Sequence, residues 1–181
     1  MKSFIYSEMM VHVPLCTNKA PNNVLIISDN ADSLEKEVTK HDNINSITIG
    51  CNLDEVCEIE DKSFDVVICE KYDDSTILAH INRILTDDGQ LTISHSSLDN
   101  IEENKSLMGI LGNYFKIIMP YNLGNGSTAL LASKEYHPTA DINLHRADML
   151  DNLEFYNSDI HPASFAMGNN IRKEYLGIIK N

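Results

Sequence analysis

The strongest chemical signal in the sequence is a group of carboxylates that follows an apolar run in the middle of the chain. Glu70, Asp73 and Asp74 lie within five positions, directly after residues 64–69. Carboxylates this close repel one another, so one of them can accept a proton from an amine, or they can bind a cation jointly. The same residues also suit a solvated turn in which Asp73 or Asp74 caps the next helix.

Two other polar loops follow apolar runs. Residues 28–33, SDNADS, contain Asp29 and Asp32 but no glycine. A nucleotide-binding loop at this place normally carries glycines that let the backbone approach its ligand. The loop is therefore either an altered cofactor loop or an ordinary N-terminal cap of a helix. In the second loop, Asn52 could bind a ribose hydroxyl, and Asp54 is expected to cap the next helix.

The elements that must position these residues alternate along the chain. Short apolar runs predict strands, and apolar residues at helical spacing predict helices between them. The predicted strands are residues 24–27, 47–49, 64–69, 90–94, 114–119 and 127–133. The predicted helices are residues 34–41, 54–60, 75–85, 101–111 and 174–179, with a turn at residues 87–89.

This alternation predicts an α/β fold with a mainly parallel sheet and helices on both faces. The last two strands are joined by the short loop 122–126, which contains two glycines and is too short for a crossover helix. These two strands should therefore form an antiparallel hairpin. A parallel sheet with a C-terminal antiparallel hairpin is the outline of a Rossmann-like methyltransferase fold. Ligands in such sheets bind beyond the carboxyl ends of the strands.

Composition excludes several classes of protein. The chain has 181 residues and a formal net charge of -13, which makes a basic groove for nucleic acid improbable. It has no apolar run long enough to span a membrane and no apolar signal core at its start, so we expect a cytoplasmic protein that acts without a membrane. The four cysteines show no CxxC pair and the histidines no HxH or HExxH spacing, so we expect reduced thiols and no metal.

Three stretches resemble the spermidine synthase (polyamine aminopropyltransferase) family. Residues 4–17 read FIYSEMMVHVPLCT and are followed by PNNVLII, which is similar to the entry of that family's catalytic domain. Residues 155–167, FYNSDIHPASFAM, resemble its closing segment, and residues 132–138, ASKEYHP, resemble the motif after its last strands. The matches run in order over nearly the whole chain. The resemblance implies one catalytic domain over residues 1–181.

The chain also departs from that family. Every glycine of the family's loop is replaced within residues 28–33, and the aspartate of that loop is Ala31 here. Its ribose-binding glutamate is Asn52, and the first acid of its Asp-x-x-Asp motif is Glu70. The small N-terminal β-domain of the family has no counterpart before Tyr6, so we expect a divergent or shortened member.

The resemblance implies transfer of an aminopropyl group from decarboxylated S-adenosylmethionine, used as a co-substrate without another cofactor, to putrescine or a similar diamine. It assigns catalysis to Glu70 and Asp73. It assigns substrate binding to Tyr6, Glu8 and Tyr121, although Tyr6 also suits a core aromatic position. It places the co-substrate near Asp29, Asp32 and Asn52. A homodimer is expected from the family.

Two other hypotheses remain open. A catalytically impaired homologue that binds a ligand or a partner subunit would explain the lost glycines and Asn52. A methyltransferase that uses S-adenosylmethionine itself would fit the fold, but it would not fit the terminal motifs and would still require the lost ribose acid.

Overall fold

A six-stranded sheet forms the centre of the molecule. The computed structural model describes residues 3–72 and 75–181. The strands lie in the order β2-β1-β3-β4-β6-β5. β1, β2, β3 and β4 run parallel, whereas β6 runs antiparallel to β4 and β5. This confirms the predicted mainly parallel sheet with an antiparallel hairpin. The bounds are β1 Asn23–Ile27, β2 Asn45–Ile49, β3 Phe64–Cys69, β4 Leu85–Ser94, β5 Ile117–Asn122 and β6 Thr128–Ser133.

The central strands are buried on both faces, as their unbroken apolar runs predict. Successive residues of a strand point to opposite faces. Val24 and Ile26 of β1 accordingly pack in one hydrophobic cluster, and Leu25 and Ile27 pack in the other. Helices on both faces are therefore required to cover this sheet.

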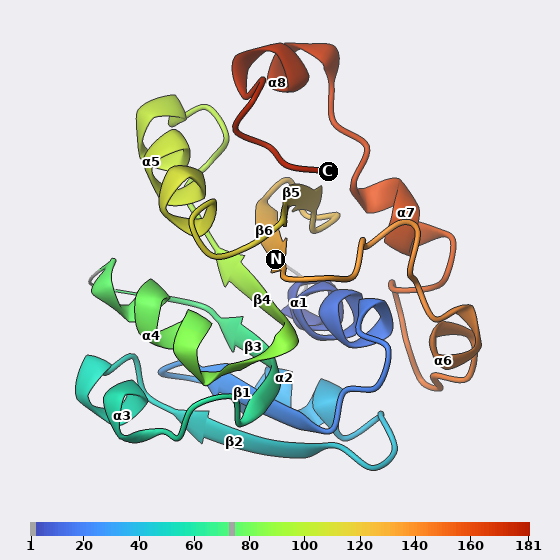
Figure 1. Cartoon of the computed structure of the whole chain (residues 1–181). Coiled ribbons are helices and arrows are strands. Elements are labelled where there is room, and N and C mark those ends of the chain that lie inside the picture. The colour runs from blue at the N-terminus through green and yellow to red at the C-terminus, as the bar shows by residue number, and fades with distance from the viewer. Residues whose placement is uncertain (1–2, 73–74) are drawn as a thin grey trace.

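The helices form the outer layers. Figure 1 shows α3, α4 and α5 on one side of the sheet and α1, α6 and α7 on the other. The helices that cover the sheet along its length are α1 Ser3–Thr17, α2 Asp32–Val38, α3 Leu53–Glu58, α4 Thr76–Ile84 and α5 Ile101–Leu111. Three short helices follow the last strand: α6 Leu144–Asp148, α7 Ile160–Ser164 and α8 Asn169–Glu174. No helix within the described residues is both long and apolar enough to cross a membrane.

Sequence patterns did not predict α1. Residues 7–17 of this helix are buried, and Pro14 lies inside it. A helix that is buried on every side shows no apolar stripe, and an internal proline argues against a helix. The hydrophobic pattern of residues 3–17 therefore did not predict a helix. The structure places α1 between the sheet and the C-terminal segment.

Two local predictions were wrong. The expected turn at residues 87–89 lies within β4, because Phe64 pairs with Leu85 and Val66 with Gln90, so the residues between form a bulge. The expected helix at residues 174–179 is also wrong. α8 ends at Glu174, and Gly177 adopts a φ of 79°, a left-handed conformation that ends helices.

Candidate functional site

Polar side chains meet where β1 and β3 end, at the carboxyl edge of the sheet. The Glu70 amide donates to the Ile27 carbonyl at 3.0 Å, and the Ser28 amide donates to the Ile49 carbonyl at 3.1 Å, so both loops leave the sheet side by side. The Ser28 hydroxyl donates a short hydrogen bond to Glu70 Oε2. Ser28 Oγ also accepts the Asn30 amide at 3.0 Å. The first loop therefore holds the Glu70 carboxylate through a side chain.

Tyr6 reaches the same edge from α1. Its hydroxyl lies 2.8 Å from Ser94 Oγ, at the end of β4. Burial raises the pKa of the Tyr6 phenol, the Ser94 hydrogen bond opposes this, and the Glu70 carboxylate raises the pKa further. Tyr6 therefore stays protonated and can donate a hydrogen bond next to the Glu70 carboxylate. Of the residues predicted to form the site, the structure brings Tyr6 and Glu70 together.

Asp73, the second predicted catalytic acid, lies outside the described residues, as does Asp74. The catalytic assignment of Asp73 stays a prediction. Tyr72, next to it, is half-buried and packs against the core, and burial raises the pKa of its phenol.

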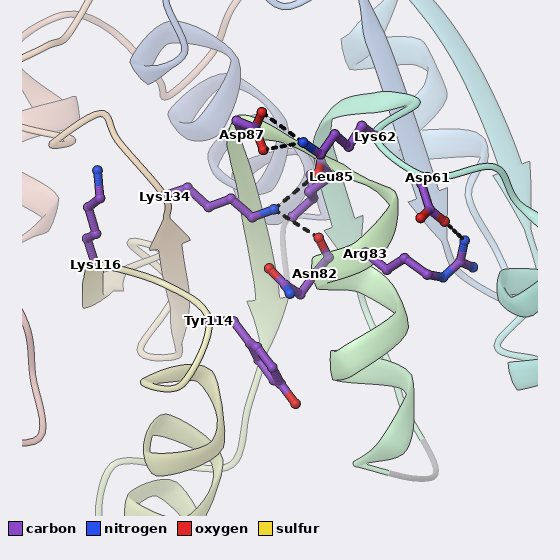
Figure 2. Close-up of a pocket in the computed structure, with 9 residues that line it drawn as sticks. All are labelled: Asp61, Lys62, Asn82, Arg83, Leu85, Asp87, Tyr114, Lys116 and Lys134. Atoms are coloured by element: carbon purple, nitrogen blue, oxygen red, sulfur yellow. Dashed lines mark hydrogen bonds and ion pairs between the residues drawn. The ribbon is translucent and has the colours of Figure 1, made fainter.

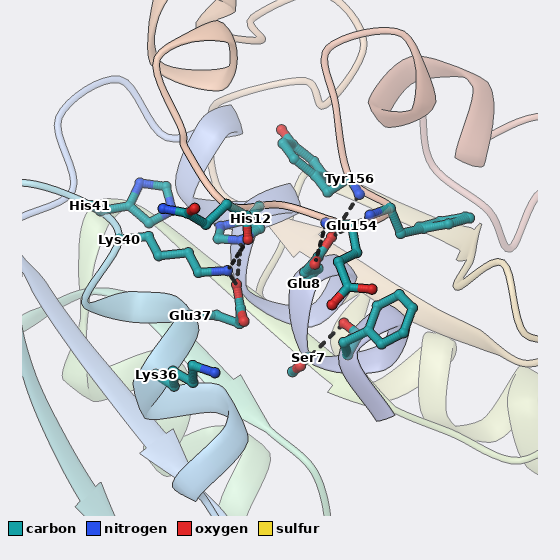
Figure 3. Close-up of polar contacts among 12 residues, drawn as sticks. Ser7, Glu8, His12, Lys36, Glu37, Lys40, His41, Glu154 and Tyr156 are labelled. Atoms are coloured by element: carbon teal, nitrogen blue, oxygen red, sulfur yellow. Dashed lines mark hydrogen bonds and ion pairs between the residues drawn. The ribbon is translucent and has the colours of Figure 1, made fainter. Parts of the chain in front are cut away.

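Glu8 is held in a different environment from Tyr6. It is 1% exposed, and its two carboxylate oxygens accept the backbone amides of Glu154, Phe155 and Tyr156 at 2.8–2.9 Å. Figure 3 shows Glu8 on α1 with Glu154 and Tyr156 of the C-terminal segment next to it. Residues two apart on a helix point about 200° apart, so Glu8 cannot share the face of Tyr6. In this structure Glu8 anchors the C-terminal segment.

Tyr121, in β5, is fully buried. Its hydroxyl donates to the Met9 carbonyl at 3.3 Å, and its ring packs against Phe165 with centroids 5.2 Å apart. Burial raises the pKa of its phenol. The side chain therefore joins β5, α1 and the C-terminal segment, and no face of it is exposed to a ligand.

The residues predicted to bind the co-substrate lie along the loops after β1 and β2. Asp29 is exposed, and its Oδ1 accepts the Cys51 amide at 3.4 Å. Asp32 is exposed in the first turn of α2, where its negative charge interacts favourably with the helix dipole. Asn52 is the N-cap of α3 and accepts the Asp54 amide at 3.1 Å. The prediction that Asp54 caps this helix was wrong, because Asn52 does so.

A polar hollow of about 240 Å³ opens just beyond Ser94, at the same edge of the sheet. His95 forms one side, with Nδ1 2.7 Å from Asn104 Oδ1 and Nε2 3.0 Å from Thr128 Oγ1. The lining residues are His95, Ser96, Ser97, Leu98, Asp99, Gly126, Ser127 and Thr128.

A larger hollow of about 570 Å³ lies at the opposite, amino-terminal edge of β3 and β4 (Figure 2). Its lysine and arginine side chains have protein partners. Lys62 pairs with Asp87 at 2.8 Å, and Lys134 Nζ donates to the Asn82 and Leu85 carbonyls at 2.9 and 3.1 Å. These contacts stabilise the bulge of β4 and the end of α4, far along the sheet from Glu70.

Sequence reasoning missed Ser28 and Ser94 as partners of the site. Ser28 directly follows the predicted strand at residues 24–27, and Ser94 is the last residue of the predicted strand at residues 90–94. Both serines therefore lie at the carboxyl ends of strands, where ligands of parallel sheets bind. That position was the available signal. A hydroxyl group carries no spacing motif, so its pairing with Glu70 or Tyr6 became visible only in three dimensions.

Comparisons of sequence support the resemblance found in the motifs. Residues 3–86 match the family model of the spermine/spermidine synthase domain. The chain is 23% identical to a polyamine aminopropyltransferase of Helicobacter acinonychis, covering 95% of this chain and 78% of that protein. It is 26% identical to a polyamine aminopropyltransferase of Methanocaldococcus jannaschii, covering 90% of this chain and 72% of that protein.

Solved structures show the same fold. A spermidine synthase in complex with the transition-state analogue AdoDATO superposes with a TM-score of 0.84 at 22% identity, over 94% of this chain and 75% of that one. A spermidine synthase from Thermotoga maritima superposes with a TM-score of 0.82 at 23% identity, over 94% and 74%. The chain thus has the Rossmann-like fold that was predicted, and over residues 3–86 its sequence is similar to the spermine/spermidine synthase domain.

Proposed function

We propose that the chain transfers an aminopropyl group from decarboxylated S-adenosylmethionine to a diamine of the putrescine type, with residues 1–181 acting as one catalytic domain. The observation that carries this proposal is the pairing of Tyr6 with Ser94 beside the Glu70 carboxylate, at the carboxyl edge of the sheet. The curated relatives that cover most of this chain carry the name polyamine aminopropyltransferase.

The charges of the reactants explain why an acidic site suits this reaction. Alkyl ammonium groups have a pKa of about 10, so a diamine carries two positive charges at neutral pH. The sulfonium of the co-substrate adds another. One amine must lose its proton before its nitrogen can attack the carbon next to sulfur. That carbon–sulfur bond then breaks, and its electron pair neutralises the sulfonium, which leaves as a thioether.

Glu70 is the proposed proton acceptor. Its carboxylate already accepts the Ser28 hydroxyl through Oε2, which fixes its orientation. Tyr6, which remains protonated, would orient the amine rather than remove its proton. Asp73 is proposed to anchor the ammonium at the other end of the diamine, and Asp99 lies in the adjoining hollow.

A specific observation favours a second candidate, a homologue that binds without catalysing the reaction. The Ser28 side chain stands where the family has glycine and is bonded to Glu70, and Asn52 is engaged as a helix cap. Both side chains are therefore already hydrogen-bonded within the protein, at the place where the co-substrate would bind.

Mass spectrometry of the product tests the first candidate. The chain incubated with putrescine and decarboxylated S-adenosylmethionine should form spermidine. Glu70→Gln should lower kcat by about 10²-fold or more, because a glutamine side chain cannot accept the proton. Glu58→Gln, on the exposed surface of α3, is the matched control and should leave the rate unchanged. Absence of product at high protein concentration would reject catalysis.

A binding measurement with methylthioadenosine distinguishes both candidates from a protein that has no nucleoside site. A ligand that binds the native state raises the thermal midpoint, and above its Kd the stabilisation grows with the logarithm of the ligand concentration. Stabilisation without product supports the binding homologue, whereas the absence of both heat of binding and stabilisation rejects a nucleoside site. Ser28→Gly should strengthen binding if the serine side chain blocks the loop.

A further inference from the structure

Two cysteine side chains meet at the carboxyl edge of the sheet. Cys69 is the last residue of β3, and Cys51 lies in the short loop between β2 and α3. In the sheet, β1 lies between β2 and β3 (Figure 1). A contact between the two cysteines therefore spans the end of β1. Both residues are thiols in this structure.

The two thiols donate hydrogen bonds to the same acceptor, the Lys71 carbonyl oxygen. Cys51 Sγ lies 2.9 Å from this oxygen, and Cys69 Sγ lies 3.2 Å from it. The two sulfur atoms are therefore no further apart than these two contacts placed end to end. Burial raises the pKa of the Cys69 thiol, and the neighbouring Cys51 raises it further. This second effect is what a nearby group that can become negative produces.

The two thiols differ in their access to solvent. Cys69 is fully buried, whereas Cys51 is partly exposed. An oxidant in solution can therefore meet the Cys51 sulfur directly. The raised pKa of the Cys69 thiol keeps it protonated, so this thiol reacts slowly with an oxidant by itself. Its accessible partner is the sulfur of Cys51.

The loop that carries Cys51 has room to adjust. A Cβ atom placed on Gly50 would lie 4.0 Å from the nearest described atom beyond its chain neighbours, Asp29 Oδ1. The Cys51 amide donates to this same oxygen through a long hydrogen bond of 3.4 Å. Bridged cysteines have Cβ atoms about 3.5–4.5 Å apart. Both thiols would have to turn from the Lys71 oxygen toward each other, and this loosely held loop can follow.

We propose that Cys51 and Cys69 form a site of reversible oxidation, at which a hydroperoxide produces an intramolecular disulfide. The Cys51 sulfur attacks one peroxide oxygen, the O–O bond breaks, and the other oxygen leaves as an alcohol or water. Cys51 is then a sulfenic acid. The Cys69 sulfur attacks the sulfenic sulfur, and the Cys69 proton leaves with the hydroxyl group as water. The two sulfur atoms together supply the two electrons that reduce the peroxide.

The bond would join two parts of the carboxyl edge. It links residues 50–52, which connect β2 to α3, to the last residue of β3. Because Glu70 directly follows Cys69, the bond forms beside the proposed base. Oxidation also removes both thiol protons, so the Lys71 carbonyl loses two donors. The inference does not depend on the proposed function, since the bond requires only the two thiols and the oxidant.

Peptide mapping by mass spectrometry tests the bond. The Cys57→Ser background removes the exposed thiol that lies 3.5 Å from His80 Nε2. In this background, hydrogen peroxide in small excess should make the protein lighter by two hydrogen atoms. Digestion without reductant should then yield a peptide that links Cys51 to Cys69, and dithiothreitol should restore the original mass. Cys16, which is buried in the other hydrophobic cluster, is the internal reference and should stay unmodified.

Two variants in the same background separate the steps. Cys69→Ala should stop the reaction at the Cys51 sulfenic acid, which dimedone traps as a stable adduct. Cys51→Ala should leave Cys69 unmodified under the conditions that oxidise the parent protein. Absence of the linked peptide, a Cys69 that oxidises equally fast in Cys51→Ala, or equal oxidation of Cys16 and Cys69 would each overturn the proposal.

Discussion

At the scale of the residue, the Ser28 side chain links the loop after β1 to the loop after β3. Ser28 replaces a glycine of the family that the chain resembles, and its hydroxyl donates a hydrogen bond to the Glu70 carboxylate. The Glu70 side chain is itself one methylene longer than the aspartate of that family. The longer acid and the added hydroxyl are thus two departures that meet in one contact. This contact holds the carboxylate of Glu70, the proposed base, at the carboxyl edge of the sheet.

Glu8 gives the sharpest prediction at the scale of a residue. Glu8→Ala would leave three backbone amides without their acceptor in a buried place. Hydrogen bonds to charged groups contribute about 1.5–3 kcal/mol each, so we expect the free energy of unfolding to fall by about 3 kcal/mol or more. Urea unfolding measures this. Glu154→Ala, which removes only a side chain beyond one of those amides, is the control, and equal losses would contradict the anchoring role.

At the scale of elements, a row of hydrogen-bonded polar side chains joins α1 to α2 and the residues directly after it (Figure 3). His12 Nε2 lies 3.0 Å from Glu37 Oε2, and His12 Nδ1 lies 2.9 Å from His41 Nε2. Lys40 Nζ lies 2.7 Å from the same Glu37 oxygen. A carboxylate only accepts, so a neutral His12 donates from Nε2 and accepts from His41. Burial lowers the pKa of His12, and burial followed by the nearby His12 lowers that of His41 to about 3.

These shifts predict a loss of stability in mild acid. The unfolded chain binds protons at its histidines near pH 6.5, whereas the folded chain keeps His41 neutral down to about pH 3. Stability is therefore complete above pH 6.5 and declines as the pH falls below it, by up to about 1.4 kcal/mol per pH unit for each such histidine. Urea unfolding between pH 7.5 and 5 measures the slope. His41→Gln should reduce that slope, and an unchanged slope would contradict this assignment.

At the scale of the whole molecule, the C-terminal residues close one edge and complete one face of the core. Tyr175 is fully buried, and its hydroxyl donates to the Leu98 carbonyl at 2.7 Å. Lys180 pairs with Ile118, and its Nζ donates to the Gly112 carbonyl at 2.7 Å. The last seven residues therefore hold β5, the end of α5 and the loop between β4 and α5 together.

Removal of residues 175–181 should destabilise the molecule by more than about 3 kcal/mol, which is the usual cost of deleting a large buried aromatic side chain. It should also expose the edge of β5 and promote association. Calorimetry and size-exclusion chromatography measure the two effects. Leu176→Ala, at an exposed side chain in the same segment, should cost less than about 0.5 kcal/mol. A truncated chain as stable as the full one would contradict the closure.

Much of the fold could be predicted because its signals are local. The run at residues 64–69 and the period at residues 101–111 coincide with β3 and α5, since each is long enough to show its own pattern. The predictions were wrong where contacts between residues far apart in the sequence determine the local structure. Pairing of Lys180 with β5 and the left-handed Gly177 end the last helix early, and neither leaves a periodic signal.

The sequence by itself determined the order of the elements, the parallel sheet and the edge at which Glu70 lies. These follow from hydrophobic periodicity, which depends on neighbours along the chain. Only the tertiary structure decided the surroundings of Tyr6, Glu8 and Tyr121, three residues to which the family resemblance assigns substrate binding. Tyr6 reaches Ser94 at the edge, whereas Glu8 and Tyr121 are enclosed by the C-terminal segment. The physical reason is that α1 is buried on all sides, so the packing of distant segments around it determines which of its side chains face a ligand.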